Sequence, residues 1–287
     1  MTNEPPGGVP GRGPRLTRRS RLALMVTAVL VVAAVVLVPV VLLGGGGGGG
    51  RKTATSLVVP EGRRADQVYA SVDRALDVPD GTTRKAAGAT RLGLPEAAGG
   101  NPEGYLFPAT YPIDPTTTPA SLLSFMVNTA NQRFGTERVI RGAERNGLTV
   151  YEAVTVASIV QAEADTAADM GKVARVVHNR LARSMPLQLD STLNYALHRS
   201  ALDTTHEDRK TDSPYNTYEN EGLPPSPIGN PGDQAMNAAI NPTRGDWLYF
   251  VTVAPGDTRF THSYAEQREN VRKFNENRRS ASREAKP

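Results

Sequence analysis

The stretch TVYEAVTVASIVQAEAD, residues 149–165, marks the start of a helix around which the rest of the chain is organised. Thr149 and Glu152 have the spacing of a capping box. In this motif the threonine hydroxyl and the glutamate carboxylate each accept a bond from a backbone amide that the helix would otherwise leave unpaired. A helix is therefore predicted to begin immediately after Thr149.

The same stretch places an acidic side chain on an apolar face. At about 100° per residue, Val156, Ile159 and Val160 form one stripe, and Glu163 falls within about 20° of Val156. Burying a lone carboxylate costs on the order of several kcal/mol, so such a group is paired, neutralised or directed into a cleft. Helix geometry alone leaves both a structural ion pair and a catalytic acid open.

Composition narrows the class of protein. The 287 residues are 39% hydrophobic and 22% charged, which is enough for one large domain or two smaller ones. The absence of cysteine excludes disulfides, thiolate metal sites and cysteine nucleophiles. The four histidines show no metal-ligand spacing, so we expect neither a metal nor a cofactor.

The N-terminal segments predict a membrane anchor. Residues 1–21 are rich in Pro, Gly and Arg and are expected to be a disordered cytoplasmic tail. Residues 22–43 carry no charge and are long enough to span a hydrocarbon core of about 30 Å, and they exceed the apolar region of a cleavable signal peptide. Residues 44–52 contain an unbroken glycine run and are expected to be a flexible tether.

The distribution of charge gives the orientation of this anchor. Five arginines precede the span: Arg12, Arg15, Arg18, Arg19 and Arg21. The positive-inside rule therefore places the N-terminus in the cytoplasm and everything after the single span outside the cytoplasmic membrane. With Glu4, the tail has a net charge of +4, which equals the charge of the whole chain. The rest is neutral, so the basic character does not indicate nucleic-acid binding.

The remaining chain predicts an α+β fold in two parts. Residues 53–118 contain a short strand, an amphipathic helix and a loop with three aromatic residues that we expect in a core. Residues 119–278 contain several helices, Pro-rich loops and a C-terminal β-hairpin within 247–262, followed by a helix from Ser263. Residues 279–287 are expected to be a disordered tail.

Six short motifs follow in a fixed order along the chain. They are Glu103–Pro108 (EGYLFP), Ala157–Glu163 (ASIVQAE), Asn179–Leu181 (NRL), Leu187–Asp190 (LQLD), Tyr215–Tyr218 (YNTY) and Gly222–Pro225 (GLPP). Together with the predicted span and small module, this order resembles the MltG (YceG-like) endolytic murein transglycosylases. The resemblance covers most of the chain after Gly50.

The resemblance implies an enzyme that cleaves nascent peptidoglycan strands internally, between N-acetylmuramic acid and N-acetylglucosamine, leaving a 1,6-anhydro end. It implies a LysM-like small module and peptidoglycan synthases as partner proteins. The family's catalytic glutamate lies in the ASIV-x-x-E segment, and many members also have an acid at the position of Gln161. This departure assigns the catalytic acid to Glu163. Ala109, Leu189 and Ser191 also depart from the common pattern.

The resemblance further implies the residues that bind the glycan strand. They are Gln188, Asp190, Tyr215, Asn216, Thr217 and Tyr218. A single acid suffices for this reaction, because the 6-hydroxyl of the muramic acid is the nucleophile, whereas a hydrolase usually needs two carboxylates. Two alternatives remain at this stage. One is a non-catalytic scaffold that binds cell wall and recruits synthases, and the other is a muramidase that hydrolyses the same bond.

Overall fold

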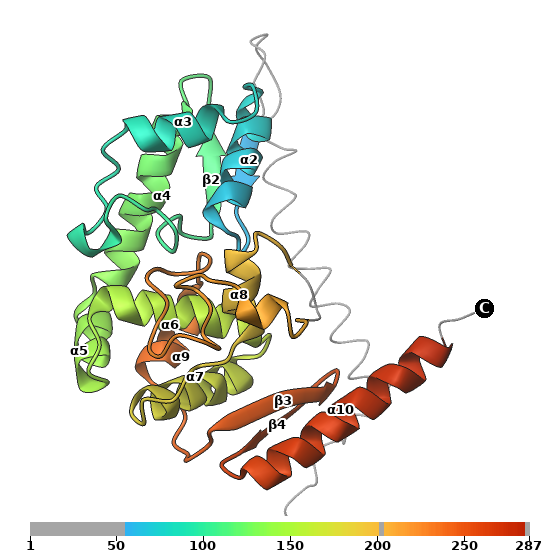
Figure 1. Cartoon of the computed structure of the whole chain (residues 1–287). Coiled ribbons are helices and arrows are strands. Elements are labelled where there is room, and N and C mark those ends of the chain that lie inside the picture. The colour runs from blue at the N-terminus through green and yellow to red at the C-terminus, as the bar shows by residue number, and fades with distance from the viewer. Residues whose placement is uncertain (1–54, 201–203, 285–287) are drawn as a thin grey trace, which may run out of the picture. The chain divides into compact units, whose positions relative to one another are not determined.

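The computed structural model describes residues 55–200 and 204–284. The predicted tail, spanning helix and tether, residues 1–52, lie outside this part of the chain. Within it, no helix combines the length and the apolar character that crossing a membrane requires. The described residues form a mixed α+β fold (Figure 1). Their buried apolar side chains form one hydrophobic core.

Helices dominate the architecture, and the strands form two short antiparallel pairs. The helices are α2 (Ala65–Leu76), α3 (Thr82–Ala89), α4 (Pro119–Phe134), α5 (Glu137–Arg145), α6 (Val150–Glu163), α7 (Ala167–Leu181), α8 (Asp190–Ala196), α9 (Asp233–Ile240) and α10 (Tyr264–Glu284), with 3-10 turns η1 (Glu96–Ala98) and η2 (Asp208–Lys210). Strand β1 (Thr55–Val58) pairs with β2 (Thr110–Ile113), and β3 (Tyr249–Ala254) pairs with β4 (Asp257–Thr261).

The N-terminal part of the fold contains the predicted strand and helix. Helix α2 packs against β1, α3 and α4. The buried Asp73 closes the turn after α2 by accepting bonds from the amides of Gly81 and Thr83, each at 2.8 Å. The aromatic side chains expected in a core, Tyr105, Phe107 and Tyr111, are all buried. That prediction is confirmed.

The predicted boundary between residues 118 and 119 does not separate two bodies. Helix α4, which was assigned to the second part, packs against α2 and α3 of the first part. At its other end Phe134 meets the rings of Tyr105 and Phe107, with ring centroids 5.8 Å apart in each pair. One continuous apolar cluster therefore joins the two predicted parts, and the described residues form one compact unit.

Helix α6 is the buried centre of the larger part. The capping box is confirmed, because the Glu152 amide donates to Thr149 Oγ1 at 3.2 Å and the Thr149 amide donates to Glu152 Oε2 at 2.7 Å. Every residue from Ala153 to Val160 is buried, and α5, α7, α8 and α9 all contact the helix. The predicted apolar stripe was therefore too narrow, because the surrounding helices and loops bury every residue from 153 to 160.

The C-terminal hairpin is confirmed, and α10 lies along it (Figure 1). Gln267 Nε2 donates to the Phe250 carbonyl at 3.0 Å, and Asn277 Nδ2 donates to the Val253 carbonyl at 2.8 Å. Helix α10 ends at Glu284, beyond the domain end predicted at residue 278. The prediction of a disordered tail is therefore wrong for residues 279–284, where the helix continues.

Gly104 gives a direct test of this packing. It has φ +85°, and a Cβ there would lie 2.5 Å from Pro227 Cγ and 3.0 Å from Val154 Cγ1 on α6. We expect Gly104→Ala to lower the free energy of unfolding by about 3 kcal/mol or more, since strain and overpacking add. Gly147→Ala, at φ +70° with open space around it, is the matched control and should cost only about 1 kcal/mol. Urea denaturation of the purified protein measures both, and equal losses would contradict the packing argument.

Candidate active site

Glu163 is the last residue of α6, and its carboxyl group lies in an unusual environment. The side chain is half-buried, and Oε1 is shielded from solvent without a hydrogen-bond partner among the described residues. Burial raises the pKa of Glu163, and the negative charge of Asp190 raises it further. The nearby hydroxyl and amide of Ser191 act in the opposite direction. The result is a carboxyl group that stays protonated to a higher pH than an exposed glutamate.

The position of Glu163 at the C-terminus of α6 also favours the protonated form of its carboxyl group. The last carbonyl groups of a helix carry a partial negative charge that disfavours a carboxylate beside them. The last turn of α6 has no basic residue to offset it. Ala164 leaves the helix in an extended conformation, so the helix ends directly after Glu163.

Asp190 and Ser191 begin helix α8 and form one side of the site. The Tyr218 hydroxyl donates to Asp190 Oδ1 at 2.6 Å. Burial raises the pKa of Tyr218, as does its bond to Asp190, so the phenol remains a donor. The structure therefore brings three groups together around α8, namely Glu163, Asp190 and Tyr218.

Gln188 stands at the turn that leads into α8. Its backbone has φ +51°, and its amide donates to the Thr217 carbonyl at 2.9 Å. The side chain is exposed, and its Oε1 accepts from Arg180 Nη1 at 3.4 Å. Of the predicted binding residues, it is the most accessible to a ligand.

Asn216 and Thr217 were predicted to line a glycan groove, but their side chains are buried. They are 0% and 1% exposed. Asn216 Nδ2 donates to the carbonyls of Arg209 and Thr211, both at 2.9 Å. Thr217 Oγ1 accepts from the Leu189 amide at 3.1 Å. Their polar atoms are used within the protein, so these two residues build the loop and are not available to a sugar.

Tyr215 is half-buried, so its exposure lies between that of Gln188 and that of the buried Asn216 and Thr217. Its hydroxyl lies 2.6 Å from Ser226 Oγ, and its ring centroid is 4.9 Å from that of Tyr195 on α8.

Gln161, where many family members have an acid, accepts from the Gly232 amide at 3.1 Å. Its role in the structure is to hold the start of α9.

Arg180 on α7 is a buried charged residue whose role the sequence did not assign. Its guanidinium donates to the carbonyls of Leu248 and Leu187, both at 2.7 Å, and lies over the Tyr249 ring at 5.2 Å. It thereby fixes the loop before Gln188 to the start of the hairpin. Its place in the Asn179–Leu181 motif was the available signal.

Glu103 is a buried acid that residue patterns did not identify. It is 3% exposed, and burial raises its pKa to about 7. It accepts from the Ala65 amide at 3.0 Å and from the Tyr195 hydroxyl at 3.1 Å. Its place in the motif Glu103–Pro108 was the only sequence signal.

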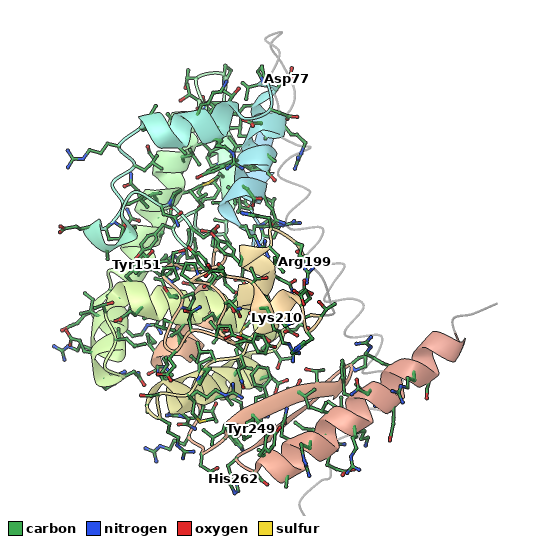
Figure 2. All side chains as sticks on the ribbon, viewed as in Figure 1. Asp77, Tyr151, Arg199, Lys210, Tyr249 and His262 are labelled. Atoms are coloured by element: carbon green, nitrogen blue, oxygen red, sulfur yellow. The ribbon has the colours of Figure 1, made fainter. Side chains whose placement is uncertain are left out.

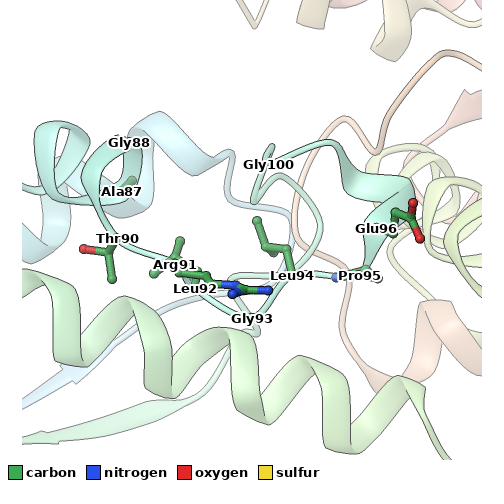
Figure 3. A pocket seen from close by; sticks show the side chains of 10 residues that line it. All are labelled: Ala87, Gly88, Thr90, Arg91, Leu92, Gly93, Leu94, Pro95, Glu96 and Gly100. Atoms are coloured by element: carbon green, nitrogen blue, oxygen red, sulfur yellow. The ribbon is translucent and has the colours of Figure 1, made fainter.

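A pocket of about 310 Å³ lies elsewhere, in the loop after α3 (Figure 3). All its lining residues fall between Ala87 and Gly100, and many of them are small. It includes neither Glu163 nor any residue predicted to bind glycan, so it does not belong to the candidate active site.

Comparisons with known proteins agree with the motif order. An endolytic murein transglycosylase of Bacillus subtilis (strain 168) is 39% identical over 173 residues, which are 60% of this chain and 48% of that protein. An endolytic murein transglycosylase of Streptococcus pneumoniae serotype 2 (strain D39) is 37% identical over 175 residues, 59% of this chain and 31% of that protein. The chain thus matches about half or less of the length of these relatives.

A crystal structure extends the comparison to the fold. The yceG-like protein from Listeria monocytogenes superposes with a TM-score of 0.66 and 31% sequence identity, and the match covers 75% of each chain. The sequence profile of the YceG-like family matches residues 42–273. This range includes the motif order, the capped helix α6 and the hairpin, and on this ground the chain belongs to the YceG-like family.

Proposed function

We propose that this protein is an endolytic peptidoglycan lytic transglycosylase with Glu163 as its catalytic acid and base. The observation that carries the proposal is the Glu163 carboxyl group, whose Oε1 is buried and whose pKa is raised by burial and by the charge of Asp190. A carboxyl group in such a setting is protonated when an ordinary glutamate is ionised, as general-acid catalysis requires. The names of the relatives support the same activity.

The reaction needs no water. Glu163 donates its proton to the oxygen that joins N-acetylmuramic acid to N-acetylglucosamine, and the bond from this oxygen to C1 of the muramic acid breaks. The 6-hydroxyl of the same muramic acid bonds to C1, and its proton passes to the Glu163 carboxylate. The products are a 1,6-anhydro-muramoyl end and an N-acetylglucosamine end with a free hydroxyl, and the enzyme is again protonated.

Four of the predicted binding residues remain candidates for contacting the glycan strand. Gln188 has an exposed amide, and Asp190, Tyr215 and Tyr218 are half-buried with polar atoms near the site. Asp190 has a further electrostatic role, because its charge opposes ionisation of Glu163 and stabilises positive charge that develops at C1.

The protein's setting is also part of the proposal. Residues 22–43 would anchor it in the cytoplasmic membrane, with the N-terminus inside and the catalytic part outside. Residues 53–118 would act as a LysM-like module that holds glycan near the membrane. Nascent peptidoglycan strands would be the substrate and peptidoglycan synthases the protein partners.

The first prediction concerns Glu163→Gln, which keeps the shape of the side chain but removes the transferable proton. We expect a loss of at least about a hundredfold in the release of anhydro-muramoyl products from uncrosslinked peptidoglycan. Mass spectrometry of the digest measures these products. Glu144→Gln, an exposed change on α5, is the control and should retain full activity.

The product chemistry also separates the alternatives. Reducing muramic acid ends would indicate hydrolysis, with Asp190 as the second carboxylate that a muramidase needs. Absence of any glycan release by the wild-type protein from nascent strands would refute catalysis and favour a wall-binding scaffold.

The second prediction is a change in pH dependence. Activity should fall as the pH rises through the pKa of Glu163, because only the protonated acid can donate. Asp190 raises that pKa, so Asp190→Asn should move the alkaline limb of kcat/KM to lower pH. Tyr218→Phe removes the hydrogen bond to Asp190 but keeps the negative charge of Asp190. The alkaline limb of this variant should therefore not move to lower pH. If the alkaline limb moved to lower pH in Tyr218→Phe but not in Asp190→Asn, the role of the Asp190 charge would be contradicted.

The third prediction tests the anchor. Removal of residues 1–52 should transfer the protein from the membrane pellet to the soluble fraction, because the uncharged segment 22–43 is lost. Alkaline carbonate washing of membranes, followed by immunoblotting, gives the measurement. Full-length protein released by the wash would count against a spanning helix.

A further inference from the structure

The carboxyl group of Glu103 joins two distant elements of the fold. Its two oxygens accept from the Ala65 amide at 3.0 and 3.1 Å, and Oε2 also accepts from the Tyr195 hydroxyl at 3.1 Å. Asn230 Nδ2 lies 3.4 Å from Oε1. Ala65 begins α2 and Tyr195 lies in α8, so one buried acid connects the N-terminal part of the chain with a helix at the candidate active site.

A second contact runs parallel to this one. Arg64, the residue before α2, donates from Nη2 to the Arg199 carbonyl at 2.8 Å, and its guanidinium lies over the Tyr195 ring at 5.2 Å. Arg199 follows α8 and is labelled in Figure 2. The start of α2 therefore holds α8 through both a carboxylate and an arginine. The positive end of the α2 dipole also faces Glu103.

Helix α8 connects this contact to the catalytic acid. It has seven residues, and its first turn carries Asp190 and Ser191, the two groups that act on Glu163. Tyr195 lies in its second turn. A helix this short moves as a rigid piece, so a displacement at Tyr195 also displaces Asp190 and Ser191.

We propose that Glu103 is a positioning residue for the active site, which fixes α8 against the start of α2 and so holds Asp190 and Ser191 beside Glu163. The inference rests on the proposed function for its catalytic consequence. Its structural part, the restraint of α8 by Glu103, stands without it.

The ionisation of Glu103 supports this role. Burial raises its pKa to about 7, and Asp66 acts in the same direction, while the Ala65 amide, the Tyr195 hydroxyl and Arg64 oppose the rise. Tyr69 on α2 also faces the group, and its own pKa is raised to about 12 by burial and by Glu103. The carboxylate can accept from all its donors, whereas the protonated acid loses one acceptor position. The restraint is therefore strongest above about pH 7 and weakens below it.

The test compares Glu103→Gln, Tyr195→Phe, the double variant and the control Glu144→Gln in the full-length protein. Tyr195→Phe removes only the hydroxyl and keeps the ring contacts with Arg64 and Tyr215. We expect each single variant to lower kcat for anhydro-product release by about tenfold with little change in KM. The double variant should show no further loss, since both changes break the same contact. The control should match wild type.

Amide hydrogen exchange gives a readout that does not depend on activity. Exchange of peptides covering α8, corrected for intrinsic rates, should rise at least about threefold in both single variants, while peptides of α5 stay unchanged. In wild type it should rise as the pH falls from about 8 to 6, and in Glu103→Gln it should not. Unchanged α8 exchange in Tyr195→Phe would overturn the proposal, as would additive kcat losses. If wild type releases no product but α8 exchange responds as expected, the proposed function fails and the restraint stands.

Discussion

The candidate active site depends on one carboxyl group, that of Glu163, which stands at the end of a helix that is buried along most of its length. Neighbouring helices cover α6 from Ala153 to Val160, so solvent and ligand can reach it only near its ends. At the C-terminal end, Glu163 meets the negative pole of the helix and the charge of Asp190. Burial and both charges favour the protonated acid. The packing that stabilises the fold thus also keeps this acid protonated to a higher pH than an exposed glutamate.

Polar residues around this acid divide into two groups by burial. Asn216, Thr217 and Arg180 use their side chains to hold backbone carbonyls and amides of the surrounding loops. Unpaired buried polar groups are costly, so these bonds make the loop conformation specific. Gln188 and Tyr218 lie on the same framework but keep solvent-accessible area. The buried residues thus fix the loops that position the accessible ones.

The N-terminal part of the described chain is integrated with the site. Its aromatic residues share one core with helices α4 and α6, and the Glu103 carboxyl group joins α2 to α8. Helix α8 is therefore held at both ends, by Glu103 near Tyr195 and by Tyr218 at Asp190. Changes in the N-terminal part have a physical route to Glu163.

Local patterns in the sequence determined the elements of this protein. The capping box at Thr149 predicted the start of α6, since its two hydrogen bonds join residues three positions apart. Two strand-like runs on either side of residues 254–257 likewise predicted the hairpin, and the motif order indicated the family. In each case the deciding interactions lie within a few residues of one another or within one short motif.

Only the tertiary structure decided which polar residues face solvent. Asn216 and Thr217 have the same polar chemistry as groove residues, yet both are buried, and Thr217 accepts from the amide of the distant Leu189. Glu103 and Tyr195 are 92 residues apart, and no local pattern predicts that they meet. The extent of burial around α6 likewise depends on helices from across the chain. Burial and long-range pairing are properties of the packed molecule, and they set the environment of Glu163.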